Sequence, residues 1–109
     1  MNNPFQISAK GSHRKILYRG PSMNPTFRDG DLLYVRACPQ EEIKIGDVVV
    51  FVSSETRIMV AHRVMAVEAC GVRTRGDNNC RNDAHVVNSV EIKGKVEYAS
   101  RGSKRLGAW

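Results

Sequence analysis

Short apolar segments alternate with polar turns along most of this 109-residue chain. The apolar segments are rich in Val, Ile, Leu and Tyr, while Gly, Pro, Asn and Asp, which favour turns, stand between them. Strands are predicted over residues 15–18, 32–35, 48–52, 59–67, 72–75, 86–87 and 92–98. Short strands with turns between them are typical of antiparallel sheets. The pattern therefore predicts a mainly β fold, a compact twisted antiparallel barrel or sandwich with little helix.

Two of the predicted strands differ in their patterning. Residues 48–52 are uninterruptedly apolar, which predicts a strand buried on both faces. Residues 59–67 alternate, which places Val60, His62, Val64 and Ala66 on one face and Ala61, Arg63, Met65 and Val67 on the other.

Residues 20–30 are rich in Pro, Asn, Asp and Gly and predict a loop, with one helical turn at most near Met23 to Phe27.

Size and composition predict one soluble domain over residues 1–109, with residues 1–14 as a flexible arm. The three cysteines form no CxxC pair, which is typical of a reducing compartment and predicts a cytoplasmic protein. No apolar run reaches the length of roughly 18 residues that a membrane span needs. The net charge of +6 is scattered, so it favours a solvated basic surface over a nucleic-acid site, although a peripheral contact with an anionic membrane is compatible with it.

Ser22 and His62 are the residues that suggest chemistry. Ser22 lies between Pro21 and Pro25 in a stiff turn that could hold its hydroxyl outward. A serine needs an adjacent base to become a nucleophile, and a partly buried histidine, neutral at physiological pH, fits that role. Each residue also has a simpler explanation, Ser22 as an ordinary Ser-Pro loop and His62 as a core histidine bonded to a carbonyl.

The segment Gly76 to Asp83 supplies two carboxylates, Asp77 and Asp83, either of which could orient His62. A calcium loop does not fit, because Arg81 occupies a position that needs an oxygen ligand. Turn chemistry of the Asx type is a sufficient explanation for Asn78 and Asn79. The cysteines and His85 lack the spacing of a zinc site, and no glycine-rich phosphate loop is present, so neither a metal nor a cofactor is expected.

Four motifs in order resemble the signal peptidase and LexA-repressor superfamily of serine peptidases. They are Ser22-Met23-x-Pro25-Thr26 with Arg28-Asp29-Gly30-Asp31-Leu32-Leu33, then Ile45 to Phe51, then His62-Arg63-Val64, then Arg75 to Asn79 with Asp83. The histidine in His-Arg-Val is similar to the branch of endoplasmic-reticulum and archaeal signal peptidases, whereas bacterial leader peptidases and LexA-type autoproteases use lysine. The family fold is a twisted, largely antiparallel β structure.

The resemblance implies a role for each motif residue. Ser22 would be the nucleophile, His62 the general base, Asp83 the orienting carboxylate and Asp77 a supporting carboxylate. Gly20 departs from the family, whose lysine enzymes carry there a serine that donates to the oxyanion. Without that hydroxyl only backbone N–H groups remain, and one lost donor costs about 2.7–4 kcal/mol of barrier. No membrane anchor is expected either, so the resemblance is to the short soluble members of the superfamily.

Three functions are compatible with these observations. The first is a signal-peptidase-like serine endopeptidase that cleaves a leader or signal-type peptide held in extended conformation, with an anchored partner supplying any membrane contact. The second is a non-catalytic module that binds peptides or proteins on the same fold. The third is a basic domain that binds nucleic acid, which only the charge favours.

Overall fold

A computed structural model describes residues 13–107 and 109, and almost all of its regular structure is β-strand. The strands are β1 (Arg14–Leu17), β2 (Leu32–Arg36), β3 (Val48–Val52), β4 (Met59–Glu68), β5 (Gly71–Arg75), β6 (Val87–Asn88), β7 (Ile92–Arg101) and β8 (Lys104–Leu106). Two short 3-10 turns, η1 (Gln40–Glu42) and η2 (Ser89–Glu91), precede β3 and β7. The mainly β fold predicted from the sequence is confirmed.

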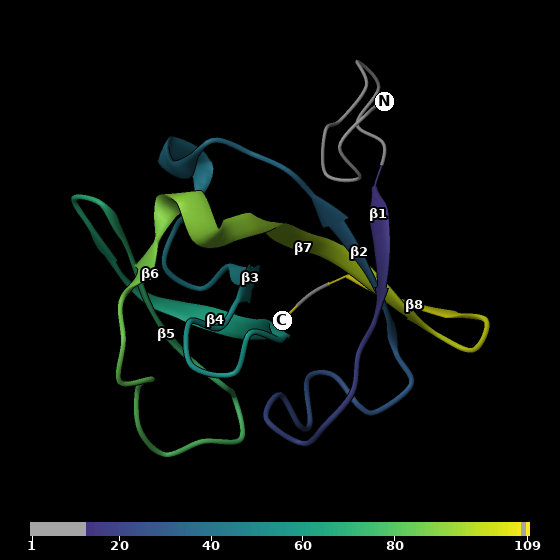
Figure 1. Ribbon diagram of the computed structural model, residues 1–109. Helices are drawn as coiled ribbons and strands as arrows, with labels where there is room; N and C mark the ends of the chain where they lie inside the picture. The colour runs from purple at the N-terminus through teal and green to yellow at the C-terminus, as the bar shows by residue number, and fades with distance from the viewer. Residues whose placement is uncertain (1–12, 108) are drawn as a thin grey trace.

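All eight strands join one antiparallel sheet in the order β1-β2-β7-β3-β4-β5-β6, with β8 paired to β7. The pairing register shifts at Tyr34/Val35, at Val50/Phe51 and at Val64/Ala66. Such bulges bend and twist a strand. The sheet consequently curls into a half-barrel, which Figure 1 shows with β1 and β6 at its two ends.

The core lies on both faces of β3, as the apolar run predicted. Val48 and Val50 belong to a cluster that includes Tyr18, Met23 and Phe27. Val49 and Phe51 project to the other face, into a cluster with Ile43, Val64, Val72 and Val87. A fully buried valine contributes about 1.5–3 kcal/mol relative to an exposed one, so β3 is a main source of stability.

Strand β4 follows the predicted alternation only as far as Val64. Val60 and Val64 contact the cluster around Val49, whereas Ala61 packs into the cluster on the opposite face. The bulge between Val64 and Ala66 then breaks the alternation, so placing Ala66 on the face of His62 by simple period-two counting was wrong.

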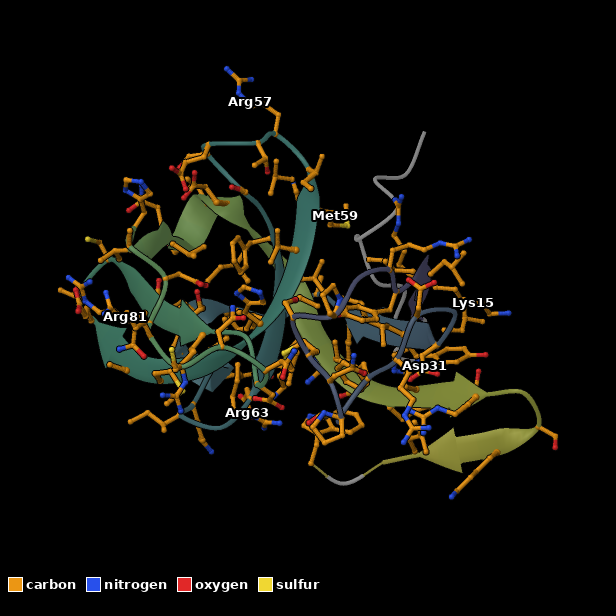
Figure 2. All side chains as sticks on the ribbon, turned by 90° about the horizontal axis from the view of Figure 1, so that it is seen from below. Lys15, Asp31, Arg57, Met59, Arg63 and Arg81 are labelled. Atoms are coloured by element: carbon orange, nitrogen blue, oxygen red, sulfur yellow. The ribbon has the colours of Figure 1, made fainter. Side chains whose placement is uncertain are left out.

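Several further details differ from the sequence prediction. Strand β1 starts at Arg14, inside the predicted arm, whereas residues 1–12 lie outside the described part. Strand β8 and both 3-10 turns were not predicted. Within the described residues no helix is long and apolar enough to cross a membrane. Three of the basic residues, Lys15, Arg57 and Arg81, lie far apart on different sides of the molecule (Figure 2).

Candidate active site

The turn that carries Ser22 is held by buried side chains after the serine and by a backbone hydrogen bond before it. Met23 and Phe27 are fully buried, and the Phe27 N–H donates to the Met23 carbonyl at 3.0 Å, which closes a turn that belongs to no helix. Gly20 has φ +98°, a conformation that suits glycine, and its N–H donates to Asp29 Oδ1 at 2.8 Å. Ser22 therefore projects, half-buried, from a turn that is fixed at both ends.

Asp31 closes the loop that follows the serine turn. Its buried carboxylate accepts two hydrogen bonds from Arg101, at 2.9 and 2.8 Å, and one from the Arg28 N–H at 2.8 Å. The hydrogen bonds from Arg101 lower the pKa of Asp31 from its ordinary value, so the carboxylate is charged in the folded protein. The segment Arg28 to Asp31 thus fastens this loop to the end of β7.

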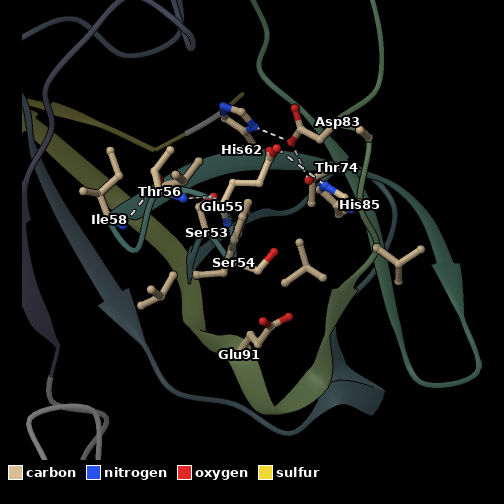
Figure 3. Close-up of a pocket in the computed structure, with 16 residues that line it drawn as sticks. Ser53, Ser54, Glu55, Thr56, Ile58, His62, Thr74, Asp83, His85 and Glu91 are labelled. Atoms are coloured by element: carbon tan, nitrogen blue, oxygen red, sulfur yellow. Dashed lines mark hydrogen bonds and ion pairs between the residues drawn. The ribbon is translucent and has the colours of Figure 1, made fainter.

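His62 lies on β4 opposite Val49 and is almost completely buried. Its Nδ1 is 2.5 Å from Asp83 Oδ2, as the dashed line in Figure 3 marks. The Thr74 hydroxyl donates to the same carboxylate oxygen at 2.7 Å, and the Asp83 N–H donates to the Thr74 carbonyl at 2.7 Å. The carboxylate thus has a fixed position, and it favours the tautomer in which Nδ1 carries the proton and Nε2 accepts one.

Gly76 is where the serine turn and His62 come together. A Cβ built on this buried glycine would lie 2.5 Å from the Ser22 carbonyl oxygen and 3.1 Å from His62 Nε2. The Ser22 carbonyl also accepts a hydrogen bond from the Asn78 N–H at 2.8 Å. Ser22 and His62, distant in sequence, therefore both lie next to Gly76, the first residue of the acidic turn (residues 76–83). The Nε2 atom of His62 faces the serine turn.

The hydroxyl of Ser22 does not yet contact its proposed base. Among the described residues, Ser22 Oγ forms one hydrogen bond, to the Tyr18 hydroxyl at 3.2 Å, and none to His62. Catalytic hydrogen bonds are often long or misaligned in the absence of substrate and tighten when it binds. The proposed pair requires a closer approach of Ser22 Oγ to His62 Nε2.

Asp77 contacts Arg63 rather than His62. Arg63 donates to both of its oxygens, at 2.8 and 2.7 Å, and the Thr26 hydroxyl donates to Oδ2 at 2.5 Å. The hydrogen bonds from Arg63 lower the pKa of Asp77 from its ordinary value. Arg63 also donates to the carbonyls of Gly46 and Trp109. The Asp77–Arg63 pair therefore fastens the acidic turn to the serine turn and to the chain beside β3.

This arrangement gives a physical reason for the His-Arg-Val sequence. Successive residues of a strand point to opposite faces, so His62 contacts Asp83 while Arg63 contacts Asp77. Val64 then fills the core beneath the histidine. Two aspartates of one turn are thereby assigned to two different partners.

An apolar groove extends from Ser22 and His62 along the open side of the half-barrel. Leu17, Ile58 and Met59 line it and are 49%, 61% and 39% exposed. Among the described residues β1 pairs with β2 alone, and β4 pairs with β5 only from Arg63 onward, so within that part of the chain both strands present an unpaired edge at the groove. Such edges can take up an extended peptide.

A cavity of about 280 Å³ lies on the other side of the His62–Asp83 pair (Figure 3). The turn at residues 53–58 and the segment at residues 83–87 enclose it, and Ile58, Val60 and His62 separate it from the groove. In the part of the chain that the structure describes, no cluster of three His, Cys, Asp or Glu side chains could hold a metal ion.

If the chain is the peptidase expected from the sequence, replacing Gly76 by alanine should lower the rate of peptide cleavage by about 10- to 100-fold. The new methyl group must push the Ser22 carbonyl away from His62 Nε2, and a displacement near 1 Å is costly in an active site. The rate is measured as kcat/KM on a cleaved peptide. Gly107→Ala is the matched control, because a Cβ there meets nothing within 4 Å; equal rates for the two variants would contradict the prediction.

Sequence comparisons give the chain's relationships. A family model described as Peptidase S24-like matches residues 5–97. The signal peptidase complex catalytic subunit SEC11 of Lachancea thermotolerans is 40% identical over 68 residues, which cover 57% of this chain and 40% of that protein. Human signal peptidase complex catalytic subunit SEC11C is 36% identical over 63 residues, or 53% of this chain and 33% of that protein. The corresponding subunit of Sclerotinia sclerotiorum is 34% identical over 70 residues, or 60% and 41%.

The chain spans less than two thirds of the length of these curated relatives. The family match nevertheless covers all four motifs, from the serine turn to Asp83. This chain belongs to the Peptidase S24-like family, in the signal peptidase and LexA-like superfamily and on the branch of the SEC11 catalytic subunits.

Proposed function

We propose that this protein is a serine endopeptidase that cleaves leader or signal-type peptides with Ser22, His62 and Asp83. One observation carries the proposal: the Nδ1 of His62 is 2.5 Å from Asp83, while its Nε2 faces the serine turn beside an apolar groove. Peptidase relatives that are named as signal peptidase subunits support the substrate class.

In the proposed mechanism Ser22 Oγ attacks the scissile carbonyl as its proton passes to His62 Nε2. Collapse of the tetrahedral intermediate breaks the C–N bond, and Nε2 returns the proton to the leaving amine. Water then hydrolyses the ester on Ser22 with the same histidine as base. Asp83 keeps the imidazole oriented and stabilises the imidazolium that forms in each half-reaction.

The substrate would bind in extended conformation along the open edges of β1 and β4. Backbone hydrogen bonds would give affinity, and the apolar groove would select apolar or small side chains. Contact with an anchored partner, or with an anionic membrane near the basic surface, stays a prediction. A cytoplasmic location and a single domain over residues 1–109 also stay predictions.

A non-catalytic peptide-binding module is the alternative, and two observations favour it. Gly20 stands where the lysine enzymes of the family have a serine, and Ser22 Oγ bonds to Tyr18 rather than to His62. A defined set of extended peptides with apolar residues, incubated with the protein and read by mass spectrometry, separates the two functions. We expect cleavage at one bond type. Binding by calorimetry with every peptide left intact would establish the module instead.

A further inference from the structure

Tyr18 is a buried residue whose position the fold fixes closely. It follows β1, is 5% exposed and packs its ring against Phe27, with 6.0 Å between the ring centroids. Its N–H donates to the Asp31 carbonyl at 2.8 Å, and its carbonyl accepts from the Gly30 N–H at 2.9 Å. The phenol is therefore held before any substrate arrives, with its hydroxyl under the serine turn.

The Tyr18 hydroxyl has two hydrogen-bond partners, and it accepts from one of them. The Met23 N–H donates to it at 2.9 Å, and Ser22 Oγ lies 3.2 Å away. Because an amide N–H is only a donor, the phenol accepts that bond and still has its own proton, which it can donate to Ser22 Oγ. The proton of Ser22 is then free to turn toward His62 Nε2.

The serine turn otherwise has few donors to offer a developing oxyanion. Pro21 has no N–H, and the N–H groups of Gly20, Met23 and Asn24 already donate to Asp29, Tyr18 and the Pro21 carbonyl. Within the described residues, only the Ser22 N–H of this stretch has no acceptor. A single backbone donor is a weak oxyanion hole.

We propose that Tyr18 is a further catalytic residue, whose hydroxyl holds Ser22 Oγ before attack and donates to the oxyanion after it. The oxyanion sits on the carbon that Oγ bonds, so a donor in contact with Oγ is adjacent to the new negative charge. The phenol proton stays on Tyr18 throughout, and no bond of Tyr18 forms or breaks. This role takes the place of the serine hydroxyl that is absent at Gly20, and it rests on the proposed peptidase function.

Tyr18→Phe tests this role because it removes the hydroxyl and keeps the ring against Phe27. We expect kcat to fall about 100-fold or more, as for other lost oxyanion donors, with KM within about threefold of the wild-type value. The Tm should fall by no more than about 8 °C. Tyr98→Phe is the matched control: Tyr98 stacks on Tyr34 away from the groove, and its kcat should be unchanged.

Two outcomes would overturn the role of Tyr18 and leave the proposed peptidase function standing. They are an unchanged kcat in Tyr18→Phe, and a rise in KM at constant kcat, which would show a purely structural role. An inactive wild type would overturn both proposals. If Tyr18→Phe does not fold, 4-fluorophenylalanine at position 18 replaces it, because fluorine fills the place of the hydroxyl but cannot donate a hydrogen bond. The same fall in kcat is expected, and an unchanged kcat would overturn the role.

Discussion

Ser22→Ala is expected to lower kcat for peptide cleavage by a factor on the order of 10⁶, the largest effect of any single substitution in this chain. The reason is chemical, because in the proposed mechanism the acyl-enzyme forms through Oγ and alanine has no atom that can take its place. The fold should persist, since the only hydrogen bond of that hydroxyl among the described residues is to Tyr18. Cleavage is followed by mass spectrometry, and folding by circular dichroism.

Ser103→Ala is a suitable control for this variant. Ser103 lies in the exposed turn between β7 and β8, far along the chain from the groove-lining residues, and the same atom is deleted there. Wild-type rates are expected for the control. Cleavage by Ser22→Ala at more than about a hundredth of the wild-type rate would mean that another group, or a contaminating peptidase, does the chemistry.

Asp83→Asn should be the second most damaging change, with kcat lowered by about 10⁴-fold and KM little altered. The carboxylate accepts the Nδ1 proton of His62, and an amide can donate to Nδ1 instead and so stabilise the tautomer that cannot act as base at Nε2. Thr74 would still contact position 83, so the turn should keep its conformation. Steady-state kinetics separate kcat from KM.

Asp77→Asn is the matched control, because it makes the same chemical change six residues earlier in the same turn. Asp77 pairs with Arg63, so we expect a loss of about 2 kcal/mol in unfolding free energy and a kcat within about tenfold of wild type. The lowered pKa of Asp77 means that its stabilisation is present above the unfolded value near 3.8 and is lost as the pH falls through the lower, folded value. The unfolding free energy of Asp77→Asn should therefore fall less over this acidic pH range than that of the wild type. A lower kcat in Asp77→Asn than in Asp83→Asn would assign the orienting role to Asp77.

Local patterns were sufficient for most of the strands but not for those that depend on pairing. The apolar run at β3 matched its predicted bounds, because burial on both faces leaves a continuous signal. Strand β8 is Lys-Arg-Leu and exists because β7 offers an edge, which no local pattern records. The bulge at Val64/Ala66 is likewise set by the register with β5.

The candidate site was partly predictable for a similar reason. The order of motifs identified Ser22, His62 and the two aspartates, but both aspartates occur in one turn and only the structure separates their partners. Tyr18, for which we propose a catalytic role, was not singled out from the sequence. Its signal is an aromatic residue four positions before the serine, which looks like an ordinary core residue until the hydroxyl is seen to contact Ser22.

The most direct test of the catalytic assignment is to capture the acyl-enzyme. The protein is mixed with an ester of an apolar peptide, quenched in acid within the first turnover, and digested for mass spectrometry. We predict that the acyl group is found on Ser22 in the wild type, accumulates in the first turnover, and is absent from Ser22→Ala and His62→Ala. An acyl group on any other residue, or one that forms on Ser22 equally fast without His62, would contradict the assignment.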